Sequence, residues 1–296
     1  MKHSLKDWIL ATRPWSFPAS SMPVLVTLFW LLANGDEVNW LLGILALVNI
    51  IFVHAAGNVW SDYFDYKKGV DRDDTYSVQT LTSGQFTPQE VMRLSVVLQI
   101  IAVAMGIMMV CLCGLPLLWI GLTGIALSLC YPPLKYVALG DVVIALCYSV
   151  LPMVGVSFIA SGEIHWPVLW LAVPVGLITI GILHANNTRD IETDVRARIH
   201  TFSMLTGRAF AAGVYYFEVL FPYLWMLGLC VFGVTSWWTM LSWLSLPLAL
   251  QNVKTMSQWK TGGIAAFARL DEATAKLQMA FSLTLIVGLL VWHFTA

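Results

Sequence analysis

Charged residues are scarce in this chain of 296 residues: Asp, Glu, Lys and Arg make up 11% of it, whereas apolar residues make up 58%. A soluble protein carries about 25% charged residues, because water covers its surface. The shortage excludes an ordinary water-covered surface, and we expect much of the surface to contact membrane lipid. The formal net charge is −1, and we expect no nucleic-acid partner.

Cysteine is also sparse, and nothing in its placement indicates a metal site. The chain has five cysteines, all within apolar runs: Cys111, Cys113, Cys130, Cys147 and Cys230. Their spacing does not match that of metal ligands, so we expect small apolar helix residues. No cleavable signal is evident either. Residues 1–14 are typical of an interfacial helix that leads into the first span.

The apolar runs are long enough to cross a membrane. A spanning helix needs about 20 apolar residues, and the sequence contains about nine such runs. We expect an all-α integral membrane protein, a single domain over 1–296, with two helical bundles around a central cavity. A weak internal repeat relates about 16–131 to 138–252, with a ninth helix at about 274–295. The expected spans are 16–34, 40–61, 91–113, 115–131, 138–161, 166–187, 208–232, 235–252 and 274–295.

Positive charge is missing from one side of the expected membrane. With this set of spans, all 16 Lys and Arg residues fall on the same side. The connections on the other side carry Asp36, Glu37, Glu163 and His165 instead. Lys and Arg stay in the cytoplasm. We therefore predict a protein of the cytoplasmic (inner) membrane, with its N-terminus inside and its C-terminus outside.

Two acidic clusters stand out against this apolar background, and each follows a membrane-length run. Ionised carboxylates at the end of a membrane helix are costly because they lose water there. Residues four apart share a helix face, so each cluster can direct several oxygens to one point. Such oxygens suit Mg²⁺, which also binds phosphates. The first cluster contains Asn58, Asp62, Asp65 and Asp71; the second contains Asn186, Asn187, Asp190 and Asp194.

Basic residues on the same side complete a candidate diphosphate site. The paired N–H donors of an Arg guanidinium match two phosphate oxygens, and the Lys ammonium acts as a point charge. Two clusters facing each other can hold two Mg²⁺ ions with a diphosphate between them, which would favour C–O cleavage. Solvated loop acids are the alternative for either cluster alone. The cations expected to complete this clamp are Lys68, Arg72, Lys135, Arg189 and Arg198, and both clusters should face the cytoplasm.

Three ionisable residues lie deeper in the expected helices. We interpret His54 and His184 as polar packing residues. Glu218 lies inside an expected span, where an ionisable group is costly and is normally kept for a structural or functional role. A helix–helix hydrogen bond and a substrate contact both remain open for it.

Four segments together resemble the UbiA superfamily of intramembrane prenyltransferases. The resemblance covers nearly the whole chain, and both acidic motifs are closest to the menaquinone-pathway branch. The segments are Arg13-Pro14-Trp-Ser-Phe-Pro18, Ser61-Asp62-Tyr-Phe-Asp65 with Lys68-Gly-Val-Asp71, Tyr131-Pro-Pro-Leu-Lys135-Tyr-x-x-Leu139-Gly-Asp141, and Asn186-Asn187-x-Arg189-Asp190-x-x-x-Asp194.

The resemblance implies a function. It implies Mg²⁺-dependent transfer of a polyprenyl group from a polyprenyl diphosphate to an aromatic acceptor. The branch implies 1,4-dihydroxy-2-naphthoate as acceptor, giving demethylmenaquinone. Asp62, Asp65, Asp190 and Asp194 would hold Mg²⁺, and Asn58, Asp71, Asn186 and Asn187 would assist. Tyr131 would contact the diphosphate together with Lys68, Lys135, Arg189 and Arg198.

The chain departs from the family pattern at Ser61, where Asn is usual, and at Gln79, where a basic residue is usual. Asn58 lies one turn before Asp62 and could supply the missing amide oxygen. Other readings stay open: another acceptor (4-hydroxybenzoate, haem or another lipid), a non-catalytic scaffold, or an ion-coupled membrane carrier. Against a carrier, the acids lie at helix ends on one side only, and we expect no helix to be broken in its middle.

Overall fold

The computed structural model describes residues 3–72 and 80–296, and within them the protein is all-helical. Eight helical stretches in this part are long and apolar enough to cross a membrane. This confirms the predicted all-α membrane fold. The stretches are α2 (Pro18–Ala33) preceded by η1 (Pro14–Ser16), α3 (Trp40–Lys68), α4 (Pro88–Cys113), α5 (Leu115–Lys135), α6 (Gly140–Ala145) with η2 (Leu146–Val150) and α7 (Leu151–Ser161), η3 (Trp166–Val168) with α8 (Leu169–Arg189), α11 (Arg208–Val231), and η5 (Ile264–Phe267) with α14 (Leu270–Thr295).

The remaining predicted span, 235–252, is a composite rather than one long α-helix. A 3-10 segment, η4 (Trp237–Ser245), continues into α12 (Leu246–Ser257) and the short α13 (Trp259–Gly262). The first part of this composite lies very close to α14: a Cβ added at Gly288 would come within 2.3 Å of the carbonyl oxygen of Trp238. Only glycine permits this approach of two backbones.

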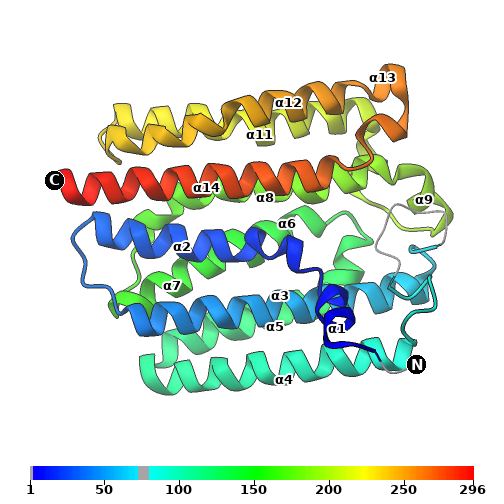
Figure 1. Cartoon of the computed structure of the whole chain (residues 1–296), viewed down its shortest axis with the longest axis horizontal. Coiled ribbons are helices and arrows are strands. Elements are labelled where there is room, and N and C mark those ends of the chain that lie inside the picture. Colours follow the sequence, from blue (N-terminus) through cyan, green and yellow to red (C-terminus); the bar gives the residue numbers. More distant parts are fainter. Residues whose placement is uncertain (1–2, 73–79) are drawn as a thin grey trace.

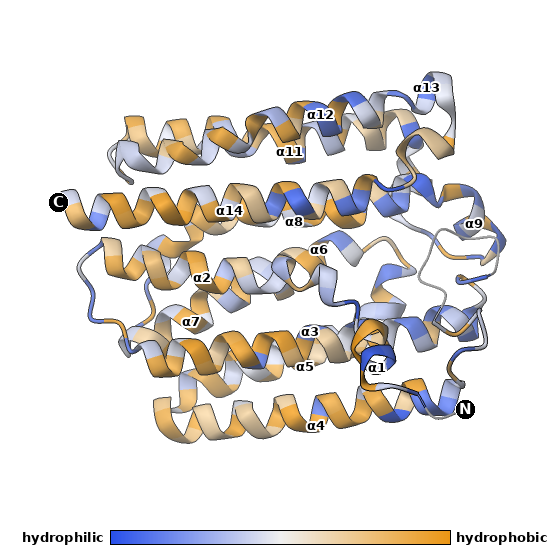
Figure 2. Cartoon of the chain, viewed as in Figure 1, coloured by the Kyte–Doolittle hydropathy of each residue, from blue (hydrophilic) through white to orange (hydrophobic). Residues whose placement is uncertain are grey.

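The polar residues gather at one end of the helix bundle. Figure 1 shows the N-terminus at the end where α3 and α8 finish, and the C-terminus at the opposite end. Figure 2 shows the hydrophilic residues concentrated at that same end and the hydrophobic ones along the spans. The short helix α1 (Leu5–Ala11) lies across this end, with Leu5, Ile9 and Leu10 exposed. Its position at the membrane interface stays a prediction.

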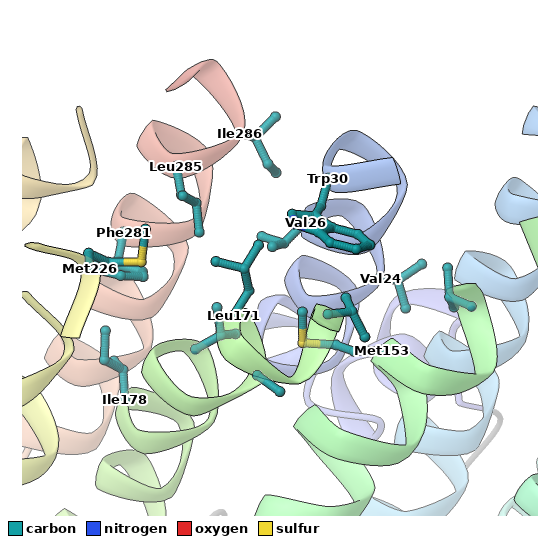
Figure 3. Close-up of a cluster of buried hydrophobic side chains, with 14 of the residues drawn as sticks. Val24, Val26, Trp30, Met153, Leu171, Ile178, Met226, Phe281, Leu285 and Ile286 are labelled. Carbon is teal, nitrogen blue, oxygen red and sulfur yellow. The ribbon is translucent and has the colours of Figure 1, made fainter. Parts of the chain in front are cut away.

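The largest cluster of buried apolar side chains joins helices from both halves of the chain. Trp30 of α2, Met153 of α7, Leu171 of α8 and Phe281 of α14 all belong to it (Figure 3). Side chains of this size exclude water and pack at crystal-like density, so these helices form a rigid frame. The frame fixes the positions at which α3 and α8 end.

One spanning helix, Gly140–Ser161, departs from regular α-helical geometry in its middle without being broken. Between α6 and α7 the chain forms a π-helical segment, η2, over Leu146–Val150. Pro152 follows in the first turn of α7 and has no N–H to donate to the preceding turn. Wider turns of this kind occur mostly as single bulges inside α-helices and are frequent at functional sites.

Two short helices, α9 (Ile191–Arg196) and α10 (Phe202–Thr206), connect α8 to α11 at the polar end. The first of them carries Asp194, the last residue of the second acidic motif, and the second leads the chain to α11. Gln79, one of the departures from the family pattern, lies outside the described residues.

Candidate active site

The first acidic motif lies on a single continuous helix. α3 continues past the predicted end of the span to Lys68 and stops at Gly69, which adopts a left-handed conformation with φ 76°. Asn58, Asp62 and Ser61 therefore keep helical spacing, and Ser61 and Asp65 share a helix face. The Ser61 hydroxyl donates to Asp65 Oδ2 over 3.2 Å. Asp62 and Asp65 are both buried.

Asp65 is held by residues from α5 and the loop that follows it. Lys135 Nζ donates to Asp65 Oδ2 over 3.0 Å, and the Tyr136 hydroxyl donates to Oδ1 over 2.7 Å. Burial, followed by the charge of Asp65, raises the pKa of Tyr136. Its hydroxyl therefore stays protonated and remains a donor. Both oxygens of Asp65 are engaged, and the carboxylate has a fixed orientation.

Asp62 forms an ion pair with Arg13, which lies just before the first span. The other carboxylate oxygen, Asp62 Oδ2, is buried and has no hydrogen-bond partner. Burial disfavours the charge of Arg13, but Asp62, Asp71 and Asp65 outweigh it, and the pKa of the guanidinium rises. The sequence alone places Arg13 only in a family-like segment and assigns it no role in the site. The structure brings it into the site.

The second motif is interrupted by the end of α8. The helix stops at Arg189, and Asp190 caps it with φ −91° and ψ 10° before α9 begins. Asn186, Asp190 and Asp194, which are spaced four residues apart, therefore do not lie on one continuous helix. Their spacing survives, because Asp190 N donates to Asn186 O over 2.9 Å and Asp194 N to Asp190 O over 2.8 Å.

Arg189 binds its own neighbour in this motif. Its Nε and Nη2 each donate to one oxygen of Asp190 over 2.7 Å, a two-pronged contact. Its Nη1 donates to the carbonyl oxygen of Ala268 over 2.8 Å and lies 3.6 Å from Asp271. In this structure Arg189 fixes Asp190 against the start of α14.

Asp194 is buried and receives a long hydrogen bond of 3.5 Å from the Thr201 hydroxyl. Burial raises the pKa of Asp194 to about 7, with Lys135 opposing the shift and Asp190 and Asp65 adding to it. The electrostatic neighbours of Asp194 thus include Lys135 and Asp65 of the first half of the site. The two motifs face each other.

A small apolar cluster holds the two motifs together. Val70, which follows the first motif, packs with Ala197 and Ile199, which follow the second, and Tyr136 lies against them. His200 N also donates to Tyr136 O over 2.9 Å. The loops after α3, α5 and α9 therefore form one unit around the carboxylates.

The donor atoms fit Mg²⁺ bound together with a phosphate. Within the described part of the chain, no three Asp, Glu, His or Cys side chains form a ready metal cage. Mg²⁺ is normally held by one or two carboxylates, water and substrate phosphates, so a cage is not required. Asp62 Oδ2 and Asn186 Oδ1 are buried oxygens without hydrogen-bond partners, one from each motif. They are suitable ligands.

The other predicted site residues divide into two groups. Tyr131 is partly buried near Lys135 and Asp65, and Asn187 is buried at the end of α8. Lys68 and Arg198 are exposed at the edge of the site, and Asp71 is partly exposed just beyond Gly69.

Sequence reasoning gave no role to Tyr136; its place next to Lys135 in a family-like segment was the available signal.

The deeper ionisable residues form hydrogen bonds between helices. His184 Nδ1 of α8 lies 3.0 Å from Glu218 Oε1 of α11, which supports the helix–helix interpretation of Glu218. His54 Nδ1 lies 2.8 Å from Ser20 Oγ, and its Nε2 lies 3.3 Å from Ser16 Oγ. Both histidines join neighbouring helices, in agreement with a packing role.

A membrane helix bundle with two facing acidic motifs and basic residues between them defines a class: an intramembrane protein built to bind a multivalent anion through cations. The model of the UbiA prenyltransferase family matches residues 20–271, so the chain belongs to this family, and it is a prenyltransferase.

Curated relatives match over nearly the whole chain. UbiA prenyltransferase domain-containing protein 1 of Xenopus tropicalis is 31% identical, over 98% of this chain and 83% of its own length. The homologue in Drosophila melanogaster is 32% identical, over 98% of this chain and 80% of its own. These relatives carry the family name and not specifically that of the menaquinone branch.

Solved structures support the fold. A UbiA homologue from Aeropyrum pernix K1 superposes with a TM-score of 0.68 at 16% identity, covering 93% of this chain and 97% of its own. One from Archaeoglobus fulgidus, bound to GPP and Mg²⁺, gives 0.65 at 14% identity, covering 95% and 99%. At this identity the likeness concerns the fold.

Proposed function

We propose that this prenyltransferase transfers a polyprenyl group from a polyprenyl diphosphate to an aromatic acceptor, in a reaction that depends on Mg²⁺. The observation that carries the proposal is the facing pair of acidic motifs, with Asp62 and Asp65 opposite Asp190 and Asp194. The structural neighbour from Archaeoglobus fulgidus, which binds GPP and Mg²⁺, supports it.

Acidic and amide residues of the chain would bind Mg²⁺, and basic residues would bind the diphosphate. Asp62, Asp65, Asp190 and Asp194 would hold Mg²⁺, with Asn58, Asp71, Asn186 and Asn187 assisting. Mg²⁺ supplies positive charge that stabilises the departing diphosphate. Lys135 would bind a diphosphate oxygen from within the site, together with Tyr131 and Arg189, and the exposed Lys68 and Arg198 would do so from its edge.

The reaction breaks the bond between the prenyl carbon and oxygen, and the electron pair leaves with the diphosphate. The allylic cation is attacked by the electron-rich ring, and a C–C bond forms. The apolar surroundings of the spans keep water away, because water would quench the cation. The attacked ring carbon then loses its proton, which restores the aromatic ring. For 1,4-dihydroxy-2-naphthoate, the acceptor that the branch resemblance favours, the carboxylate is also lost as CO₂, and the quinol form of demethylmenaquinone results.

The test uses the purified full-length protein in lipid nanodiscs with geranylgeranyl diphosphate, Mg²⁺ and one acceptor at a time. The acceptors are 1,4-dihydroxy-2-naphthoate, 4-hydroxybenzoate and haem, and products are identified by mass spectrometry. We expect a prenylated product with the naphthoate and none when Mg²⁺ is chelated. Product from another acceptor alone would correct the acceptor. No product and no diphosphate release with any acceptor would favour the scaffold or carrier reading.

We also propose that the site faces the cytoplasm. The N-terminus and both motifs lie at the polar end of the bundle, and the C-terminus lies at the other end (Figure 1). Cysteine labelling from outside intact cells, in a background without native thiols, should modify position 163 but not position 68. The reverse pattern would reject this orientation.

A further inference from the structure

A short stretch between α1 and α2, residues Thr12 to Ser16, lies over the first acidic motif; we refer to it as the entry segment. Asn58 Nδ2 donates to the carbonyl oxygen of Thr12 and to Ser16 Oγ, each over 3.0 Å. Arg13, between them, pairs with Asp62. The entry segment therefore contacts two of the residues expected to bind Mg²⁺.

The backbone fixes the place of Arg13. Arg13 has φ 56° and ψ 59°, a left-handed conformation that is unfavourable for a non-glycine residue. Its carbonyl oxygen accepts hydrogen bonds from Ser16 N over 2.9 Å and from Ser16 Oγ over 2.8 Å. Its own N–H donates to Leu10 O over 3.0 Å. These contacts hold the unfavourable conformation and direct the side chain to the motif.

The pair between Arg13 and Asp62 is incompletely satisfied on both sides. Arg13 Nε is buried without an acceptor, and Asp62 Oδ2 is buried without a donor. A buried polar atom without a partner is unfavourable, because it has lost its hydrogen bonds to water. The arrangement leaves the guanidinium able to bind another anion and the carboxylate able to bind another cation. Arg13 also keeps 26% of its side chain exposed, whereas Asp62 keeps 4%.

We propose that Arg13 and the divalent cation compete for Asp62, and that Arg13 binds the diphosphate when the cation takes that carboxylate. This inference rests on the proposed function, since it assumes a site for Mg²⁺ and a prenyl diphosphate. It assigns Arg13 a substrate-binding role and makes binding of the two ligands mutually dependent.

The charge balance explains the coupling. Without the diphosphate, Mg²⁺ must displace the Arg13 guanidinium from the Asp62 carboxylate in order to bind there, so Mg²⁺ binds weakly. With the diphosphate present, the displaced guanidinium gains an anionic partner with several oxygens, which suits its fork of donors. Each ligand then raises the affinity for the other by the same factor. Lys135 differs from Arg13 in that its contact Asp65 keeps a second partner, Tyr136, on its other oxygen.

The experiment measures binding rather than turnover. The full-length protein in nanodiscs is titrated by calorimetry with MgCl₂ alone, and then with a non-hydrolysable thio analogue of geranylgeranyl diphosphate at saturating Mg²⁺. The variants are Arg13→Gln and Arg13→Lys. Lys6→Gln is the matched control, because it removes one positive charge from the exposed surface of α1.

For Arg13→Gln we expect opposite shifts: about fivefold tighter binding of Mg²⁺ alone, and about tenfold weaker binding of the analogue, since a charge-assisted contact is lost. Arg13→Lys should show the same signs with smaller shifts, and it serves as the test if Arg13→Gln does not fold. Lys6→Gln should match the wild type in both titrations.

Both shifts are required. Unchanged or weaker binding of Mg²⁺ in the Arg13 variants would overturn the competition, and unchanged binding of the analogue would overturn the substrate contact. Equal shifts in Lys6→Gln would show a surface-charge effect instead. If the wild-type protein binds neither Mg²⁺ nor the analogue, the proposed function itself fails, which is a distinct result.

Discussion

The two acidic motifs have the same residue types but are held in different ways. In the first, Asp62 and Asp65 lie on one unbroken helix, and their partners come from distant parts of the chain: Arg13, Lys135 and Tyr136. In the second, the helix ends within the motif, and Asp190 is held by the residue next to it, Arg189.

The difference shows two ways to fix a carboxylate at a membrane helix end. The second motif is largely orientated by local contacts, and its link to the rest of the bundle runs through Arg189 to Ala268. The first depends on the packing of α5 and of the entry segment against α3. Changes that loosen tertiary packing should therefore affect the first motif before the second.

The largest expected effect comes from removing a carboxylate of either motif. Asp62→Ala, Asp65→Ala, Asp190→Ala and Asp194→Ala should each lower turnover by at least about 100-fold, because Mg²⁺ would lose a ligand. Removal of a charge lowers the cost of membrane insertion, so each variant should insert normally. Turnover is measured with saturating Mg²⁺ and insertion by fractionation. Full activity in both variants of one motif would show that this motif does not bind the metal.

The second expected effect concerns pH and Asp194, whose pKa is raised to about 7. Mg²⁺ binds the ionised carboxylate, so protons compete with it as pH falls through this value. Between pH 8 and pH 6 the Mg²⁺ concentration for half-maximal binding of the diphosphate analogue should rise about tenfold more than in Asp194→Asn. Ionisation of the diphosphate is common to both proteins, so the difference isolates Asp194. Parallel curves for the two would contradict the assignment.

A smaller effect is expected at Tyr136. Its variant tests most directly whether the first motif depends more on distant contacts than the second motif does. Tyr136→Phe removes the hydrogen bond to Asp65 and should lower turnover about fivefold, corresponding to about 1 kcal/mol. Because Phe is nearly the same size, the apolar cluster of Val70, Ala197 and Ile199 should persist, and thermal stability should change little. Thr201→Val, which removes the long contact to Asp194, is the counterpart in the second motif. A larger loss of turnover in Thr201→Val than in Tyr136→Phe would contradict the view that the first motif depends more on contacts from distant parts of the chain.

The smallest effect is expected at Ser61. Its hydroxyl donates to Asp65 and reaches the metal only through that residue or through water. The amide nitrogen of Asn58 donates to Thr12 and Ser16, so its carbonyl oxygen points away from these two partners. We expect Ser61→Asn to preserve activity and to lower the Mg²⁺ concentration for half-maximal rate about two- to threefold, as an added amide ligand would. Asn58→Ala should raise it. Loss of activity in Ser61→Ala, with no effect of Asn58→Ala, would make Ser61 a direct ligand.

Hydropathy and helical spacing predicted much of this site. Asp62, Asp65 and Ser61 lie as their spacing indicated, because four-residue periodicity is a property of the helix itself. The extension of α3 to Lys68 and the capping role of Asp190 were not predicted. Helix ends depend on capping contacts, such as the left-handed Gly69 and the pairing of Arg189 with Asp190, and hydropathy does not report these.

The amino-acid sequence by itself determined that the chain is a helical membrane protein with its charge at one end and with acidic motifs in pairs. Those properties follow from transfer of side chains to lipid and from local periodicity. Only the tertiary structure decided that Arg13 meets Asp62 and that Tyr136 and Lys135 meet Asp65, across separations of 49, 71 and 70 residues. Contacts of that range exist only once the spans have packed, because packing of the large apolar side chains sets where the polar ends meet.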